Sequence, residues 1–115
     1  MDNKEILKTA YDAIADKKGE RIRILDISKV SIMAEYFIVT NGNNVNHVQA
    51  IADNVSEELR KIGVELKQSE GYRTAGWILM DFGSVIVHVF SKDDRFFYDL
   101  ERVWSDGTVV EIGDL

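Results

Sequence analysis

The chain of 115 residues contains no cysteine and no proline. Without cysteine it can form no disulfide, no thiolate zinc site and no covalent intermediate on a thiol. The lack of proline argues against a stiff, extended linker between domains. Because a chain of this length ordinarily folds around one core, we expect a single domain over residues 1–115.

The chain also lacks an excess of positive charge. The chain has 14 Lys and Arg residues against 20 Asp and Glu residues, and its formal net charge is −6. Proteins bind bare DNA or RNA largely by displacing counterions with Lys and Arg, so we expect no direct DNA binding. A basic protein surface suits this acidic chain better as a partner.

Long apolar runs are missing as well. No run approaches the roughly 20 residues that cross a bilayer, and the polar start at residues 1–5 leads into a helical pattern rather than a signal peptide. The hydrophobic fraction of 45% and charged fraction of 30% are typical of a folded, soluble domain. We therefore expect a cytoplasmic protein that binds no membrane.

Apolar periodicity predicts three helices. Apolar side chains recur every three or four residues at 2–18, where Asp2 or Asn3 can cap the first turn. The same spacing extends through 45–62, and a shorter pattern covers 93–104. Each helix has one apolar face, so each needs another element to pack against.

Five segments have the alternating or uniformly apolar pattern of β-strands. They lie at residues 21–25, 35–40, 64–68, 77–81 and 84–91, and a short apolar tail follows at 108–112. The runs at 35–40 and 85–89 suit central strands, whereas the alternation at 64–68 suits a position nearer an edge. The order predicts a mixed sheet of about five strands with helices packed on it, an α/β or α+β domain.

Two connections follow from this order. The strands at 77–81 and 84–91 should form a hairpin joined at Phe82-Gly83. The helix at 45–62 should cross over between the strands at 35–40 and 64–68.

No motif for catalysis or metal binding stands out. His47 and His88 belong to no ligand pattern, and we interpret His88, in an apolar strand, as a buried, hydrogen-bonded residue. Asp93 and Asp94 are adjacent, but acidic residues at a helix start commonly cap amides. The chain has no nucleophile elbow, phosphate-binding loop or dinucleotide-binding fingerprint. We therefore expect no catalytic residue, no metal site and no cofactor.

Two aromatic residues lie at the edges of a glycine-rich loop. Tyr72 follows Gly71, and Trp77 follows Gly76 at the start of a strand. Large aromatic side chains in such places either cover the core or anchor a protein interface, where Trp and Tyr are enriched. The pattern leaves both interpretations open. Asp81 is similarly either a turn residue or a surface contact.

Several short motifs follow one another along nearly the whole chain. They are Glu-Tyr-Phe-Ile-Val at 35–39, Asn-Gly at 41–42, His-Val-Gln-Ala-Ile-Ala-Asp-Asn-Val at 47–55, Glu-Gly at 70–71, Trp-Ile-Leu-Met-Asp-Phe-Gly at 77–83 and Val-Ile-Val-His-Val-Phe at 85–90. Any one of them alone would be a weak signal. In their order and spacing they resemble the ribosomal silencing factor family, RsfS, also called Iojap.

The resemblance implies a function that composition does not. Members of this family are not enzymes; they bind the large ribosomal subunit through ribosomal protein uL14, block joining of the large and small subunits and so repress translation. The resemblance further implies a homodimer and a nucleotidyltransferase-like core without an active site.

The resemblance also implies a binding surface. The strand at 77–81 matches the family's binding segment, and the two-residue period of a strand places Trp77, Leu79 and Asp81 on one face. We expect this face, together with Glu70 and Tyr72, to contact uL14.

The alternative is a nucleotidyltransferase-like enzyme or nucleotide-binding module. Transfer by two metal ions needs two or three converging carboxylates and a loop for the phosphates. Enzymes of that fold carry Gly-Ser followed by Asp-x-Asp or Asp-x-Glu. This chain has Gly83-Ser84 without either of the following motifs.

Overall fold

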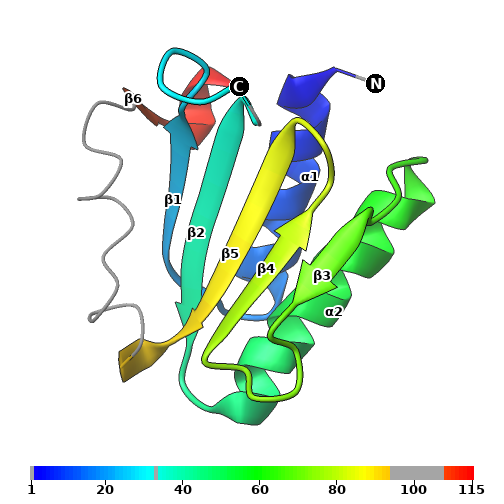
Figure 1. The fold of residues 1–115 in the computed structure, drawn as a ribbon, viewed down its shortest axis with the longest axis vertical. Helices are drawn as coiled ribbons and strands as arrows, with labels where there is room; N and C mark the ends of the chain where they lie inside the picture. The colour runs from blue at the N-terminus through cyan, green and yellow to red at the C-terminus, as the bar shows by residue number, and fades with distance from the viewer. Residues whose placement is uncertain (1, 33, 94–107) are drawn as a thin grey trace.

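A computed structural model of the chain describes residues 2–32, 34–93 and 108–115. These residues form a six-stranded mixed sheet in the order β3-β4-β5-β2-β1-β6, with helices α1 and α2 on one of its faces (Figure 1). Within this part of the chain, β2 and β5 pair in parallel and the other neighbouring strands pair antiparallel. The predicted mixed α+β class is therefore confirmed.

The elements have the following bounds. The helices are α1 at Asn3–Asp16 and α2 at Val45–Lys61. The strands are β1 at Glu20–Asp26, β2 at Tyr36–Gly42, β3 at Gln68–Glu70, β4 at Trp77–Asp81, β5 at Val85–Ser91 and β6 at Thr108–Val110. A short 3-10 helix follows at Ile112–Asp114.

Side chains at the helix starts explain where both helices begin. Asp2 caps α1 by accepting a hydrogen bond from the backbone N–H of Glu5 at 2.9 Å. Asn44 caps α2 by accepting one from the backbone N–H of His47 at 2.8 Å. These bonds satisfy amides that a helix cannot pair internally, so the cap residues set the two boundaries.

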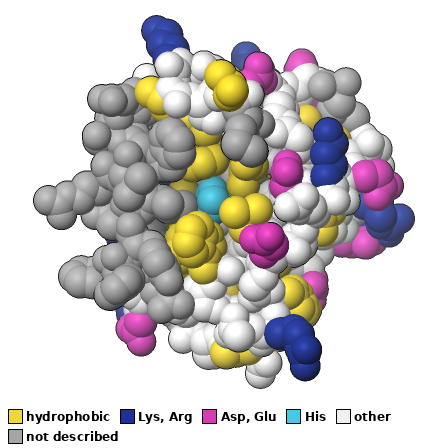
Figure 2. Space-filling model, in the orientation of Figure 1, with side chains coloured by type: hydrophobic (Ala, Val, Ile, Leu, Met, Phe, Trp, Pro, Cys, Tyr) yellow, Lys and Arg dark blue, Asp and Glu magenta, His cyan; other side chains and the backbone are white. Residues whose placement is uncertain are grey.

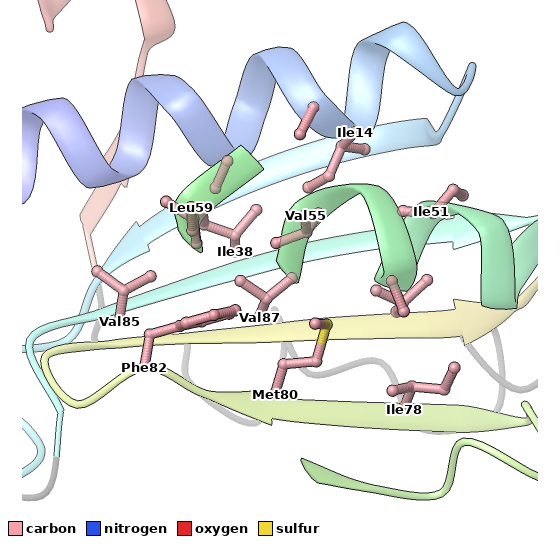
Figure 3. Packing of buried hydrophobic residues seen from close by; sticks show 14 of the residues in the cluster. Ile14, Ile38, Ile51, Val55, Leu59, Ile78, Met80, Phe82, Val85 and Val87 are labelled. Carbon is pink, nitrogen blue, oxygen red and sulfur yellow. The ribbon is translucent and has the colours of Figure 1, made fainter. Parts of the chain in front are cut away.

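The main core lies between the two helices and the sheet, as Figure 3 shows. Its fully buried side chains include Ile14 of α1, Ile38 of β2, Ile51, Val55 and Leu59 of α2, Ile78 of β4 and Val87 of β5. Each side chain of this size contributes about 1.5–3 kcal/mol when it leaves water. This layer therefore holds the helices against one face of the sheet.

A smaller apolar cluster lies on the other face, which we call the second face of the sheet. It consists of Leu25, Ile27, Ala34, Phe37, Val39 and Phe90, with Trp77 and Ile86 packed against it. Neither α1 nor α2 covers this face (Figure 1). The partly buried Trp77 and Ile86 mark where the cluster reaches the surface.

Most predicted elements are confirmed. The helices expected at 2–18 and 45–62 are α1 and α2, and the strands expected at 21–25, 35–40, 77–81 and 84–91 are β1, β2, β4 and β5. The helix expected at 93–104 lies, apart from Asp93, outside the described residues.

The strand predicted at 64–68 is wrong for most of its length. The backbone N–H of Val64 donates to the carbonyl oxygen of Leu59 at 2.9 Å, which ties this segment to the end of α2. Hydrogen bonding to β4 begins only at the backbone N–H of Lys67, and β3 starts at the next residue, Gln68.

Of two expectations about the arrangement of strands, the number of strands needs correction and the crossover is confirmed. Part of the tail expected at 108–112 forms β6, which pairs with β1 and makes the sheet six-stranded rather than about five-stranded. The crossover expected between the strands at 35–40 and 64–68 is present, with its second strand at 68–70: α2 connects β2 to β3, and the pairings across the sheet make these two strands parallel, with β5 and β4 between them.

The hairpin between β4 and β5 is confirmed, but its turn is placed one residue later than expected. The backbone N–H of Phe82 donates to the carbonyl oxygen of Val85 at 3.0 Å, which leaves Gly83-Ser84 as the turn. Gly83 has a φ of +100°, a conformation that favours glycine.

Candidate functional site

Strand β4 places alternate side chains on opposite faces of the sheet. Ile78 and Met80 are buried in the main core beneath the helices, whereas Trp77, Leu79 and Asp81 are partly exposed. Since successive residues of a strand point to opposite faces, the last three share the second face. The prediction that they lie on one face is confirmed.

Pairing between strands extends this row of side chains. Residues directly opposite each other in neighbouring strands share a face. Glu70 of β3 lies opposite Leu79, which lies opposite His88 of β5. Glu70 is exposed and Leu79 partly exposed, so a carboxylate borders an apolar side chain at this edge of the second face.

Tyr72 lies elsewhere. Its hydroxyl donates to Oδ2 of Asp53 at 3.0 Å, and its carbonyl oxygen accepts a hydrogen bond from the side chain of Gln49 at 2.8 Å. Both partners belong to α2, so Tyr72 borders the helix layer, with 41% of its surface exposed. The bond to Asp53 raises the pKa of the Tyr72 hydroxyl. The structure thus groups four of the five predicted site residues and sets Tyr72 apart.

Trp77 is both a core contact and a surface residue. Its ring stacks on Phe90 with centroids 5.1 Å apart, and its indole Nε1–H donates to Nδ1 of His88 at 3.0 Å. The side chain nevertheless stays partly exposed. The interpretation of Trp77 as a residue that covers the core is therefore confirmed, and its role as an interface anchor stays a prediction. The bond to His88 holds the exposed part of its side chain in one orientation.

Asp81 has a structural role in the hairpin. Its Oδ1 accepts a hydrogen bond from the backbone N–H of Gly83 at 2.8 Å, which supports the turn. The interpretation of Asp81 as a turn residue is confirmed. Its carboxylate is partly exposed on the same face as Leu79, so it also adds negative charge there.

His88 is a buried polar residue of this face. It is 3% exposed, and burial lowers its pKa to about 4. The imidazole is therefore neutral at neutral pH, and its Nδ1 accepts the bond from Trp77. The prediction of a buried, hydrogen-bonded histidine is confirmed, but its link to Trp77 was missed because this diagonal contact depends on the orientation of the indole side chain.

The second face combines apolar and acidic surface. In Figure 2, hydrophobic side chains gather over the middle of the sheet, and acidic side chains lie beside them toward β3 and β4. We call Glu70, Trp77, Leu79 and Asp81 the Trp77 patch. An aromatic anchor with charge at its margin is the usual composition of a surface that binds a protein.

Other kinds of site were also sought. Among the residues that the structure describes, no three His, Asp or Glu side chains are grouped so that they could hold a metal ion. In the same part of the chain, no helix is long and apolar enough to cross a bilayer.

The chain is similar to known proteins over its whole length. A family model described as "Ribosomal silencing factor during starvation" matches residues 1–115. The ribosomal silencing factor RsfS of Halalkalibacterium halodurans is 42% identical over 112 residues, which cover 97% of this chain and 96% of that protein. The RsfS of Bacillus subtilis is 41% identical over 112 residues, covering 97% and 95%.

The chain is also similar to a more distant relative and to two solved structures. The chloroplastic protein Iojap of Zea mays is 30% identical over 103 residues, which cover 87% of this chain and 43% of that protein. A crystal structure from Chromobacterium violaceum has a TM-score of 0.89 at 38% identity, covering 91% and 88% of the two chains. One from Bacillus halodurans has a TM-score of 0.84 at 40% identity, covering 95% and 99%.

Proposed function

This chain belongs to the ribosomal silencing factor family, and we propose that it represses translation by binding the large ribosomal subunit and blocking its joining with the small subunit. Such a mechanism needs no catalysis, because a bound protein excludes a second partner from the same surface by occupancy alone. The extent of repression then follows mass action, set by the concentration of the factor relative to its dissociation constant. We accordingly propose that the protein is not an enzyme.

The partner in this proposal is ribosomal protein uL14, and the Trp77 patch is the surface that meets it. The observation that supports this most is the alternation along β4, which brings Trp77, Leu79 and Asp81 to one face with Glu70 beside them. A partly exposed tryptophan fixed by a hydrogen bond loses little conformational entropy on docking. We place Tyr72 at the rim of this interface, because its side chain contacts α2 and not the second face of the sheet.

Charge supports a basic partner. Glu70 and Asp81 lie on the same face as the aromatic anchor, and the whole chain carries a net charge of −6. Complementary charge raises association rates and disfavours partners of the same sign. The Trp77 patch should therefore recognise an apolar surface bordered by Lys or Arg.

The family also suggests where the protein acts and in what state. We propose that it acts in the cytoplasm, where ribosomal subunits join, and that it forms a homodimer. Sedimentation equilibrium at micromolar concentration tests the second point, and a monomer under those conditions would refute it.

Co-sedimentation with purified subunits tests the binding step. We expect the protein to pellet with the large subunit and not with the small one, and an excess of purified uL14 should release it. Asp12→Ala, on the exposed side of α1, is a control that should bind normally. Equal pelleting with both subunits, or no effect of free uL14, would contradict the proposal.

A further inference from the structure

We propose that His88 is a positioning residue for partner binding: its Nδ1 holds the indole of Trp77 in the orientation in which the partner meets it. This inference rests on the proposed function, since it concerns the same patch. It adds a buried residue that touches no partner itself and acts only through Trp77.

The donor and acceptor roles are fixed by chemistry. The indole Nε1–H can only donate, so the His88 Nδ1, 3.0 Å away, must accept with a free lone pair. A neutral imidazole then carries its proton on Nε2. The low pKa of His88 keeps the ring in this form at neutral pH.

The imidazole is itself held in place. The Phe37 ring meets it edge-on, with centroids 4.5 Å apart, and the Phe90 ring lies nearly parallel to it at 6.3 Å. Phe90 also stacks on Trp77. Because His88 is fixed by neighbours on β2 and β5, the position of its Nδ1 defines where the indole edge can lie.

This arrangement costs stability. The second-face cluster is apolar, and burying the two ring nitrogens of a neutral imidazole beside it costs free energy unless each nitrogen is hydrogen-bonded. Among the described residues, the Nε2 of His88 has no hydrogen-bond partner. A leucine of similar size would avoid this cost, so what the imidazole contributes here is the bond to Trp77.

The bond also determines what the partner encounters. With its N–H directed to His88, the indole offers an apolar surface and no hydrogen-bond donor. The partner contact at Trp77 should therefore be an aliphatic or aromatic side chain, and polar recognition should come from Glu70 and Asp81 at the margin.

Two substitutions of His88 separate positioning from stability. His88→Leu removes the acceptor and keeps an apolar volume, whereas His88→Asn keeps an acceptor, since its Oδ1 lies two bonds from Cβ as Nδ1 does. We expect His88→Leu to bind the large subunit about fivefold to tenfold more weakly than the unmodified protein, with an equal or higher melting temperature. We expect His88→Asn to melt lower yet bind more tightly than His88→Leu.

A merely structural role predicts the opposite order of affinities, in which His88→Leu binds normally and the less stable His88→Asn binds worse. That order would overturn the inference. Should His88→Leu fail to fold, His88→Phe replaces it with the same expectations.

A double-mutant cycle tests whether His88 acts through Trp77. In a Trp77→Phe background the acceptor has no donor, so His88→Leu should change affinity no further. An equal loss in both backgrounds would overturn the inference. If the unmodified protein does not bind the large subunit at all, the proposed function fails and this inference fails with it.

An NMR measurement that needs no ribosome distinguishes the two kinds of failure. In the spectrum of ¹⁵N-labelled protein, the indole N–H signal that is missing from Trp77→Phe belongs to Trp77. In the unmodified protein this indole proton should exchange slowly with water. It should stay slow in His88→Asn and become fast in His88→Leu. Slow exchange in His88→Leu would overturn the inference and leave the proposed function intact.

Discussion

At the scale of single residues, Trp77 is the side chain whose loss should matter most for binding. Trp77→Ala should weaken binding to the large subunit by about 2–4 kcal/mol, because truncated aromatic anchors lie in that range. The fold should survive, since the main core beneath the helices is untouched. Co-sedimentation measures the affinity, and circular dichroism checks the fold.

Val45→Ala is the matched control for this substitution, because Val45 is an exposed apolar residue at the start of α2. It should bind like the unmodified protein. Loss of the circular dichroism signal in Trp77→Ala would mean that Trp77 serves the core rather than the interface.

His88 gives the protein a specific dependence of stability on pH. Its pKa is lowered from 6.5 to about 4 in the folded state, so the unfolded chain binds the proton more readily. The free energy of unfolding is therefore highest above pH 6.5 and falls as the pH falls toward 4. The His88 contribution to this loss should be about 3 kcal/mol between pH 7 and pH 4.

Urea unfolding at pH 7 and pH 4 measures this loss. The comparison with His88→Leu isolates the His88 contribution, because the two proteins differ at no other position. The variant should lose less stability on acidification. The same loss in both proteins would contradict the assignment of a neutral, buried imidazole.

At the scale of elements, the loop before β4 depends on Gly71. Gly71 has a φ of +84°, and a Cβ there would lie 2.1 Å from the carbonyl oxygen of Trp77. Gly63 has a similar φ of +89° but open space around it. Both alanine variants cost about 1–2 kcal/mol for the backbone conformation, and Gly71→Ala must also displace the start of β4.

We therefore expect Gly71→Ala to reduce the free energy of unfolding more than Gly63→Ala does, and to weaken large-subunit binding as well. Urea unfolding and co-sedimentation measure the two effects. Equal stability losses, or normal binding by a folded Gly71→Ala protein, would contradict this description of the loop.

The elements also show what the sequence could reveal. Apolar periodicity identified both described helices and the central strands, because burial against a sheet imposes these patterns directly. The segment at 64–68 alternates like a strand, yet the bond from Val64 to Leu59 keeps its first part on the helix end. The short β6 depends on a distant partner, β1, which local patterns cannot show.

The candidate site was predictable for a geometric reason. Placing the hairpin turn at Gly83-Ser84 instead of Phe82-Gly83 shifts the register of the strands by two residues, and a shift of two keeps every side chain on its face. The misplaced turn therefore left the faces unchanged, and the shared face of Trp77, Leu79 and Asp81 follows from the alternation along β4 alone. The contact between Trp77 and His88 was not predicted, because it depends on the side-chain orientation of Trp77, whose indole reaches diagonally past its paired residue Phe90 to His88.

At the scale of the whole molecule, net negative charge should speed association with a basic partner. Glu70→Lys and Asp12→Lys change the net charge equally, but only Glu70 belongs to the Trp77 patch. Glu70→Lys should slow association more and reduce its dependence on salt concentration. Stopped-flow or surface binding at several salt concentrations measures this, and equal effects of the two variants would place the interface elsewhere.

The central claim is that the bound protein keeps the two ribosomal subunits apart. Sedimentation of purified large and small subunits through a sucrose gradient, with increasing amounts of the protein, tests it most directly. We predict that joined ribosomes give way to separate subunits as the protein saturates the large subunit, and that Trp77→Ala requires a much higher concentration. Normal joining by large subunits that carry the bound protein would contradict the account.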